Sequence, residues 1–194
     1  DLYMGNHIVR YRFAVKILHS RNPGRIMDAA CGVGYGSALL AEICSGVVAV
    51  DRDIHSIEIG KSKFNKGNVH YVLDDCEQLS NVNASFDGIV SFETLEHLKK
   101  PERFLNRCHE LLHDNGQLII STPNQLVSGF ESKQDWEYHE KEYTPAELTA
   151  ILKESGFSSV KLFGQFYSPI GKMRNQFRSE LRRLHSNPFV RVGK

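Results

Sequence analysis

The sequence predicts an α/β fold in which a mostly parallel, twisted sheet carries helices on both faces, as a three-layer sandwich. Short apolar runs alternate with helical patterns from residue 25 to about residue 120, the order expected of parallel strands joined by crossover helices. A chain of 194 residues, 41% of them hydrophobic, is long enough for one such domain and too short for two. A glycine-rich turn separates the first apolar run from the helical pattern after it.

The elements follow from these patterns in chain order. Strands are predicted at Arg25–Asp28, Val47–Asp51, Val69–Leu73, Asp87–Phe92 and Gln117–Ser121, with helices near residues 36–44, 54–65 and 101–113. The turn-forming residues 114–116 should close the last of these helices. A later helix begins where Thr144 can cap it, Pro145 fits the first turn and Glu147 returns the capping bond, and it should end at 155–156.

Two stretches lie outside this alternation. Residues 122–143 lack clear periodicity, and segments of that length are usually lids or binding loops, so we expect them in the substrate site. Residues 172–194 carry seven Lys and Arg against Glu180, which leaves residues 1–171 with a net charge of −5. We therefore expect a domain at 1–171 and a basic extension at 172–194. Apolar residues at helical spacing favour an amphipathic helix in this extension. We expect this helix to dock on the domain, on a second copy in a homodimer, or on a larger parent chain. An anion-binding tail is the alternative.

The bulk composition restricts the class of protein. No apolar run approaches the ~20 residues of a membrane-spanning helix, so no membrane span is expected. The four cysteines have no C-x-x-C spacing, which favours reduced thiols in a cytoplasmic protein over a disulfide framework or a zinc site. The chain begins with Asp1 and without a signal-peptide pattern, so we expect it to be a piece of a longer protein.

The glycine-rich turn predicts a cofactor site. A side chain at Gly32 or Gly34 would occupy the place of a ligand that approaches the backbone. The spacing is G-x-G-x-G, whereas nicotinamide and flavin binders carry G-x-G-x-x-G, and the strand before the turn ends in Asp28. A carboxylate is unfavourable beside a pyrophosphate but suits a cationic amino-acid ligand.

Carboxylates at the ends of the next two strands predict an adenosine pocket. Asp51 ends the second strand, where a carboxylate accepts hydrogen bonds from both hydroxyls of a ribose. Asp74, Asp75 and Cys76 end the third strand, where a carboxylate accepts one from an adenine amine. Each carboxylate alone would also fit a loop cap, but their order along the chain favours the pocket.

Five segments together resemble the class I S-adenosylmethionine-dependent methyltransferases: D-A-A-C-G-V-G-Y-G, V-A-V-D, L-D-D-C, F-D-G-I-V-S-F-E-T-L-E-H and N-G-Q-L-I-I-S-T-P-N. The resemblance covers residues 1 to about 165 and implies a Rossmann-like fold with S-adenosyl-L-methionine as cofactor. It also implies a final antiparallel strand pair, of which only Ser159–Phe163 is identifiable. By this resemblance Gly32 and Gly34 contact the methionine part, Asp51 the ribose, Asp75 and Cys76 the adenine, and Ser91 the edge of the cofactor near its sulfur. The further cofactor-binding residues that we expect are Asp28, Arg52 and Arg10.

The beginning of the chain is similar to an entry helix that closes over the cofactor in a subset of these enzymes. We assign residues 1–20 to this helix. The resemblance makes Arg10 or His7 a charge-assisted donor to the methionine carboxylate. A solvated basic face on an ordinary helix is the alternative.

A cluster after the fourth strand predicts the reactive centre. Glu93, Glu96 and His97 stand at i, i+3 and i+4, which places them on one face of a helical turn. Oxygen ligands with imidazole suit magnesium, manganese or iron, and His139 is a fourth candidate ligand. The pattern E-x-x-E-H resembles the ubiquinone-biosynthesis O-methyltransferases and the small-RNA 3′-terminal 2′-O-methyltransferases, which implies a divalent cation that lowers the pKa of the acceptor hydroxyl.

Two alternatives for this cluster need no metal. His97 can act as a general base, or can hold the loop through His139, while the glutamates accept backbone hydrogen bonds. Glu93 and Glu96 can instead simply cap a short helix.

Three functions are compatible with these features. The leading one is O-methylation of a hydroxyl on a small-molecule substrate such as a sugar, a phenol or a natural-product acceptor. An RNA ribose 2′-O-methyltransferase would need a broad basic groove, but residues 1–171 are acidic, so nucleic acid is not expected as a partner. The intact cluster of Glu93, Glu96 and His97 argues against the third, a non-catalytic cofactor-binding module of a larger assembly.

Overall fold

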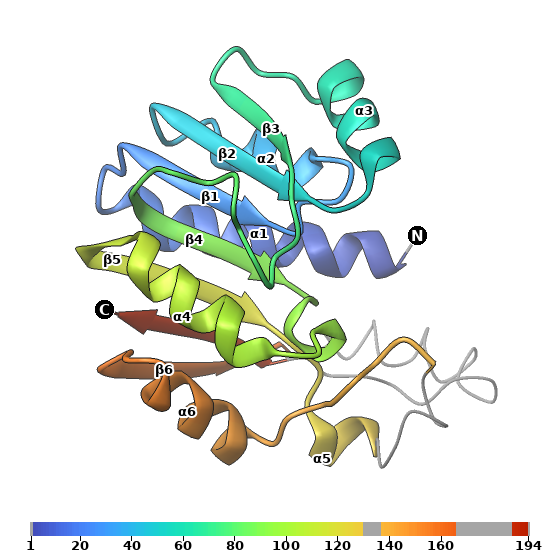
Figure 1. Ribbon diagram of the computed structural model, residues 1–194, viewed down its shortest axis with the longest axis vertical. Helices are drawn as coiled ribbons and strands as arrows, with labels where there is room; N and C mark the ends of the chain where they lie inside the picture. The colour runs from blue at the N-terminus through green and yellow to red at the C-terminus, as the bar shows by residue number, and fades with distance from the viewer. Residues whose placement is uncertain (1, 130–136, 166–187, 194) are drawn as a thin grey trace.

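The computed structural model describes residues 2–129, 137–165 and 188–193. These residues contain one seven-stranded sheet in the order β3-β2-β1-β4-β5-β7-β6 (Figure 1). Strands β1 to β5 pair in parallel, and β7 is antiparallel to both β5 and β6. The bounds are β1 (Arg25–Ala29), β2 (Gly46–Asp51), β3 (Val69–Leu73), β4 (Phe86–Phe92), β5 (Leu112–Ser121), β6 (Ser159–Gly164) and β7 (Pro188–Gly193). The predicted mostly parallel α/β sheet is confirmed.

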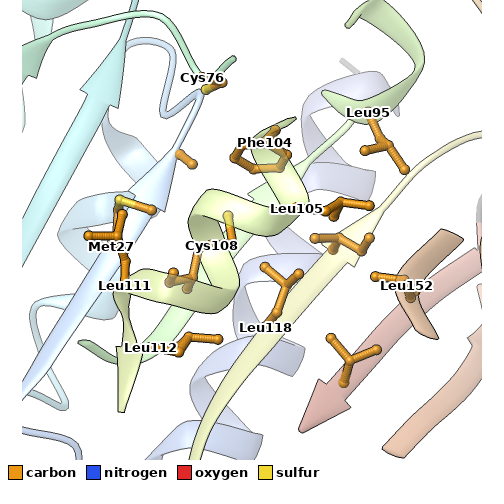
Figure 2. Packing of buried hydrophobic residues seen from close by; sticks show 14 of the residues in the cluster. Met27, Cys76, Leu95, Phe104, Leu105, Cys108, Leu111, Leu112, Leu118 and Leu152 are labelled. Carbon is orange, nitrogen blue, oxygen red and sulfur yellow. The ribbon is translucent and has the colours of Figure 1, made fainter. Parts of the chain in front are cut away.

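Two apolar layers cover the two faces of the sheet. Helices α1 (Leu2–His19), α2 (Tyr35–Leu40) and α3 (Ile54–Lys63) share one buried cluster, which contains Ile26 of β1. Helices α4 (Pro101–Leu111) and α6 (Pro145–Glu154) share the other, which contains Met27. Figure 2 shows Phe104, Leu105 and Cys108 of α4 in this second layer. Successive residues of β1 thus face opposite layers, as strand geometry requires, and the predicted three-layer sandwich is confirmed.

The predicted elements are present, but the predicted boundary between helix α4 and strand β5 was wrong. Helix α4 ends at Leu111, because Leu112 already has extended backbone with φ −80° and ψ 140°. Residues 114–116 do not close the helix: they lie in β5, where the pairing with β4 shifts from Phe86↔Leu112 to Gly88↔Gln117. Helices α2 and α3 end earlier than predicted, at Leu40 and Lys63. Helix α6 carries the predicted capping box between Thr144 and Glu147.

The expected boundary at residue 171 is corrected by β7. This strand lies inside the sheet between β5 and β6, so the end of the predicted extension 172–194 belongs to the domain. Val190 and Val192 are buried completely, on either side of Arg191. This alternation has the period of a strand, whereas the basic charge of the segment, taken alone, favours a separate element. The predicted amphipathic helix before it lies outside the described residues.

Strand β7 is also the second strand of the final antiparallel pair, of which the sequence had identified only β6. The pair that the resemblance implied is therefore present. Among the described residues, no helix has both the length and the apolar character to cross a membrane.

Candidate active site

A cavity of about 310 Å³ opens beyond the carboxyl ends of β1, β2, β3 and β4. Ligands bind open α/β sheets where the strand order changes direction, here between β1 and β4. The structure brings six of the predicted site residues to the cavity wall. The lining consists of Ala30, Asp51, Arg52, Asp75, Cys76, Glu93, Thr94, His97, Leu98 and Tyr138.

The glycine turn and Asp51 form one unit. The backbone N–H of Gly32 donates to Asp51 Oδ2 at 2.7 Å, and the N–H of Asp53 donates to Oδ1 at 2.9 Å. Gly32 has φ +54°, and a Cβ built on it would meet no atom within 4 Å. The turn therefore leaves open space beside a carboxylate whose orientation is fixed from both sides.

Gly34 is required for a reason different from the predicted one. A Cβ at this position would lie 2.2 Å from the hydroxyl oxygen of Tyr71, and φ is +86°. Tyr71 packs its ring against both Gly34 and Gly60. The expectation that a side chain at Gly34 would fill the ligand's place is therefore corrected: it would strike the tyrosine that supports the turn.

Asp28 lies behind the cavity and is fully buried. Its carboxyl group accepts a hydrogen bond from Ser37 Oγ at 2.6 Å and another from the Tyr11 hydroxyl at 3.0 Å. Burial raises the pKa of Asp28 to about 7, against these two hydrogen bonds, which lower it. The structure thus places Asp28 between α1 and α2, and it does not bring this side chain to the cavity wall.

Arg10 and His7 of α1, the two alternative donors expected for the methionine carboxylate, lie in different environments. The Arg10 guanidinium is buried, and its Nη1 lies 3.0 Å from Glu93 Oε1. Its Nε donates to Gln165 Oε1 at 3.2 Å. Burial and the neighbouring Arg10 lower the pKa of His7 to about 4, so its imidazole is uncharged at neutral pH.

The remaining predicted cofactor residues divide into two groups. Asp75 lines the cavity, with Oδ1 accepting from the N–H of Glu77 at 2.8 Å. Cys76 lines it as a buried thiol whose pKa is raised to about 12 by burial and by Asp51. Ser91 lies within β4 and is 1% exposed, with no hydrogen-bond partner for its Oγ among the described residues, and it does not line the cavity.

Three of the four predicted metal ligands come together. One ligand atom from each of Glu96, His97 and His139 lies within 4.8 Å of the other two. The rings of His97 and His139 meet edge to face, with centroids 4.9 Å apart. Glu96 is 1% exposed and accepts a hydrogen bond from Thr122 Oγ1 at 2.9 Å. Burial and then the nearby Glu93 raise its pKa well above the usual value.

Glu93 is not part of this group. Its side chain accepts a hydrogen bond from Ser121 Oγ at 2.8 Å besides its ion pair with Arg10. Its backbone has φ +52°, a left-handed conformation that costs a side-chain-bearing residue about 1–2 kcal/mol. Arg10 thus holds the Glu93 carboxylate, and the group of Glu96, His97 and His139 does not include this fourth predicted metal ligand.

Hydrogen bonds fix the two histidines, and sequence reasoning missed one of the partners. His97 Nδ1 lies 2.7 Å from the carbonyl oxygen of Tyr138. Since a carbonyl can only accept, Nδ1 carries the proton and Nε2 carries the lone pair; Nε2 lies 3.9 Å from Glu96 Oε1. His139 Nδ1 lies 2.8 Å from Glu142 Oε1. Glu142 stands three residues after His139, a spacing that could have drawn attention to it.

Comparisons with known proteins identify the family of the chain. The family model described as "Methyltransferase domain" matches residues 7–162. A protein of Mycobacterium tuberculosis named "Probable S-adenosylmethionine-dependent methyltransferase" is 33% identical over 147 residues, covering 74% of this chain and 52% of its own length. A "Ubiquinone biosynthesis O-methyltransferase" of Azorhizobium caulinodans is 31% identical over 160 residues, covering 75% of this chain and 63% of its own length. The chain thus spans between about half and two thirds of the length of these two relatives.

Solved structures share the fold at low sequence identity. The N-methyltransferase NodS of Bradyrhizobium japonicum, in complex with S-adenosylhomocysteine, aligns with a TM-score of 0.74 and 15% identity over 98% of this chain and 86% of its own. A methyltransferase of Archaeoglobus fulgidus aligns with a TM-score of 0.70 and 22% identity over 97% and 94% of the two chains. The family match over most of the chain and the identity to the mycobacterial protein show that the chain belongs to the methyltransferase domain family, as a class I S-adenosylmethionine-dependent member.

Proposed function

We propose that this chain is the catalytic domain of a methyltransferase that transfers a methyl group from S-adenosylmethionine to a hydroxyl oxygen of a small molecule. We propose further that a divalent cation, magnesium or manganese, assists the transfer. The observation that carries this proposal is the group of Glu96, His97 and His139 beside the cavity wall formed by Asp51 and Asp75.

The cavity wall fits the cofactor. The space beside Gly32 admits a ligand against bare backbone, and the oriented carboxylate of Asp51 suits a ribose diol. Asp75 suits the adenine amine. S-adenosylmethionine, when bound, supplies a methyl group on a positively charged sulfur, so the task of the protein is to align the acceptor oxygen with that carbon.

The donor set fits a hard divalent cation. Glu96 offers a carboxylate, and His97 and His139 offer imidazoles, a combination that suits magnesium or manganese better than metals that prefer thiolates. Ligating histidines characteristically donate their second ring N–H to a carbonyl or a carboxylate, and here Nδ1 of His97 faces a carbonyl oxygen and Nδ1 of His139 faces a carboxylate oxygen. A cation at this position would lower the pKa of an acceptor hydroxyl, and it would offset the burial of Glu96.

The choice of a hydroxyl acceptor rests on the group of candidate metal ligands, Glu96, His97 and His139, and on the name of the Azorhizobium relative. A metal-free mechanism is a second candidate, because His97 lines the cavity and the lone pair on its Nε2 is able to accept a proton. The chelator arm of the experiment below separates the two.

The experiment combines a binding and a turnover measurement. S-adenosylhomocysteine should raise the melting temperature of the chain, whereas NAD should not. Methyl transfer from radiolabelled S-adenosylmethionine to a panel of sugars, phenols and catechols is then followed with manganese and with a chelator. We expect turnover to need the metal.

Variants locate the metal. Glu96→Gln and His139→Ala should each lower the affinity for Mn²⁺, measured by its electron paramagnetic resonance signal, without altering the shift caused by S-adenosylhomocysteine. His55→Ala is the matched control, because His55 is 84% exposed. Full turnover in chelator would exclude the metal and favour His97 as the base, and full turnover of His97→Ala would exclude that base as well.

A further inference from the structure

A buried carboxylate stands directly behind His139. The Glu142 side chain is completely shielded from solvent, and its Oε1 lies 2.8 Å from His139 Nδ1. Its Oε2 accepts a hydrogen bond from the hydroxyl of Ser128. Glu142 does not line the cavity. Since burial of a carboxylate is costly unless hydrogen bonds compensate for it, this placement calls for an explanation beyond loop packing.

The segment that carries Glu142 is held on both sides. The N–H groups of Glu140 and Lys141 donate to the carbonyl oxygen of Glu96 at 2.7 and 3.3 Å. On the other side, the N–H of Gln125 donates to the Tyr143 carbonyl at 3.1 Å. Gln125 opens the short helix α5 (Gln125–Ser128), which ends at Ser128. The carboxylate is therefore fixed relative to both Glu96 and α5.

The chemistry of these contacts defines the state of the imidazole. An ionised carboxylate can only accept hydrogen bonds, and the Ser128 hydroxyl donates to the oxygen that does not face His139. The proton between Glu142 and His139 then belongs on Nδ1, which leaves the lone pair on Nε2. This is the tautomer that a histidine needs in order to ligate through Nε2.

We propose that Glu142, supported by Ser128, is a positioning residue that fixes His139 in the Nδ1–H tautomer and in the orientation in which it meets Glu96 and His97. This inference rests on the proposed function, since it assigns the metal-type cluster of Glu96, His97 and His139 as the site that Glu142 serves. Because Glu142 does not line the cavity, we assign it no direct contact with cofactor or acceptor.

The chain contains its own control for this arrangement. His55 and Glu58 of α3 have the same His-x-x-Glu spacing, but they are 84% and 66% exposed and lie 3.6 Å apart. A solvated pair of this kind contributes little. Replacing Glu58 therefore changes the same residue type at the same spacing without changing a buried contact.

The experiment reads the tautomer directly. In protein labelled with [15N]histidine, two-bond nitrogen–proton correlations distinguish the Nδ1–H from the Nε2–H form, and His139→Asn identifies the His139 signal. We expect the Nδ1–H form in the parent chain and in Glu142→Gln, which keeps an accepting oxygen. Glu142→Leu should shift His139 towards Nε2–H and weaken Mn²⁺ binding about 10- to 100-fold. Glu58→Leu should change neither.

The outcomes are separable from those of the proposed function. An Nε2–H signal for His139 in the parent chain, or an unchanged tautomer in Glu142→Leu, would overturn the role of Glu142. If the parent chain binds no Mn²⁺, the metal assignment fails, while the tautomer still decides the inference. Should Glu142→Leu not fold, Ser128→Ala replaces it: a partial shift towards Nε2–H supports the proposal, and an unaltered spectrum refutes it.

Discussion

Asp28 is a residue at which the stability of the fold depends on pH. Its carboxyl group is fully buried, and its pKa is raised from 3.8 to about 7 because burial disfavours the charged form. In the unfolded chain the same group loses its proton near pH 4. Between these values the folded state binds more protons than the unfolded state, so the free energy of unfolding falls as pH rises.

We expect Asp28→Asn to remove this dependence. From pH 4 to pH 7, the free energy of unfolding of the parent chain should fall by up to about 4 kcal/mol relative to the variant, and the difference should stay constant above pH 7. Urea unfolding at four pH values in this range measures it. Asp53→Asn is the control, since the pKa of this exposed helix cap is lowered by its hydrogen bonds to Ser56 and His55 and no such fall is expected. A constant difference between the parent chain and Asp28→Asn across the range would refute the assignment.

Single residues were predicted best where the chain itself sets the geometry. Asp51, Asp75 and His97 follow strands whose carboxyl ends meet at one edge, so their positions in the sequence suffice to place them at one cavity. The partners of Asp28 and Glu93 were not predictable, because Tyr11 and Arg10 reach them from a different element, helix α1, through tertiary packing. Such contacts have no periodic signal.

Helix α1 is the element that connects the parts of the site. The Tyr11 ring packs on Gly36 of α2, where a Cβ would lie 2.0 Å from it, and its hydroxyl reaches Asp28. The next residue back, Arg10, pairs with Glu93 at the end of β4. Phe13 meets Phe163 of β6 with ring centroids 5.1 Å apart. One helix therefore touches the glycine turn, the cavity wall and the sheet edge.

The ion pair of Arg10 and Glu93 should contribute much of the free energy that holds helix α1 against the rest of the domain. Arg10→Met should destabilise the chain by about 3 kcal/mol, because it removes the buried cation that faces the Glu93 carboxylate, which is only 11% exposed. The double variant Arg10→Met/Glu93→Met should lose less than the sum of the two single losses, which a double-mutant cycle by urea unfolding measures. Arg12→Met, an exposed change on the same helix, should lie within about 0.5 kcal/mol of the parent. Additive losses would mean that the ion pair contributes nothing.

Elements were predictable from sequence except where pairing partners decide their limits. Strand β5 starts early because Leu112 pairs with Phe86 across an irregular register. No local sequence pattern predicts this pairing. Strand β7 is a short segment in which Val190 and Val192 flank Arg191. Its position is set by its pairing with both β5 and β6, which the sequence of the segment does not reveal.

The molecule as a whole depends on β7 although it comes last in the sequence. Val190 and Val192 lie in the same buried cluster as Leu118 of β5, Phe157 and Met27 of β1. The apolar layer under α4 and α6 is thus continuous from the last strand to the first. We infer that this layer unfolds as one unit rather than losing β6 and β7 separately.

Val190→Asp tests this continuity. A charge placed at a fully buried position of β7 should cost more than about 4 kcal/mol, since no cation faces it among the buried residues of that cluster. Because the layer is shared, hydrogen exchange should accelerate in β1 and β4 as well as in β6, and the shift caused by S-adenosylhomocysteine should disappear together with the cooperative transition. Arg191→Gln, in the same strand and only partly buried, should keep the parent's unfolding midpoint. Exchange that accelerates only in β6 and β7, with ligand binding intact, would show instead that the parallel part of the sheet folds without its antiparallel edge.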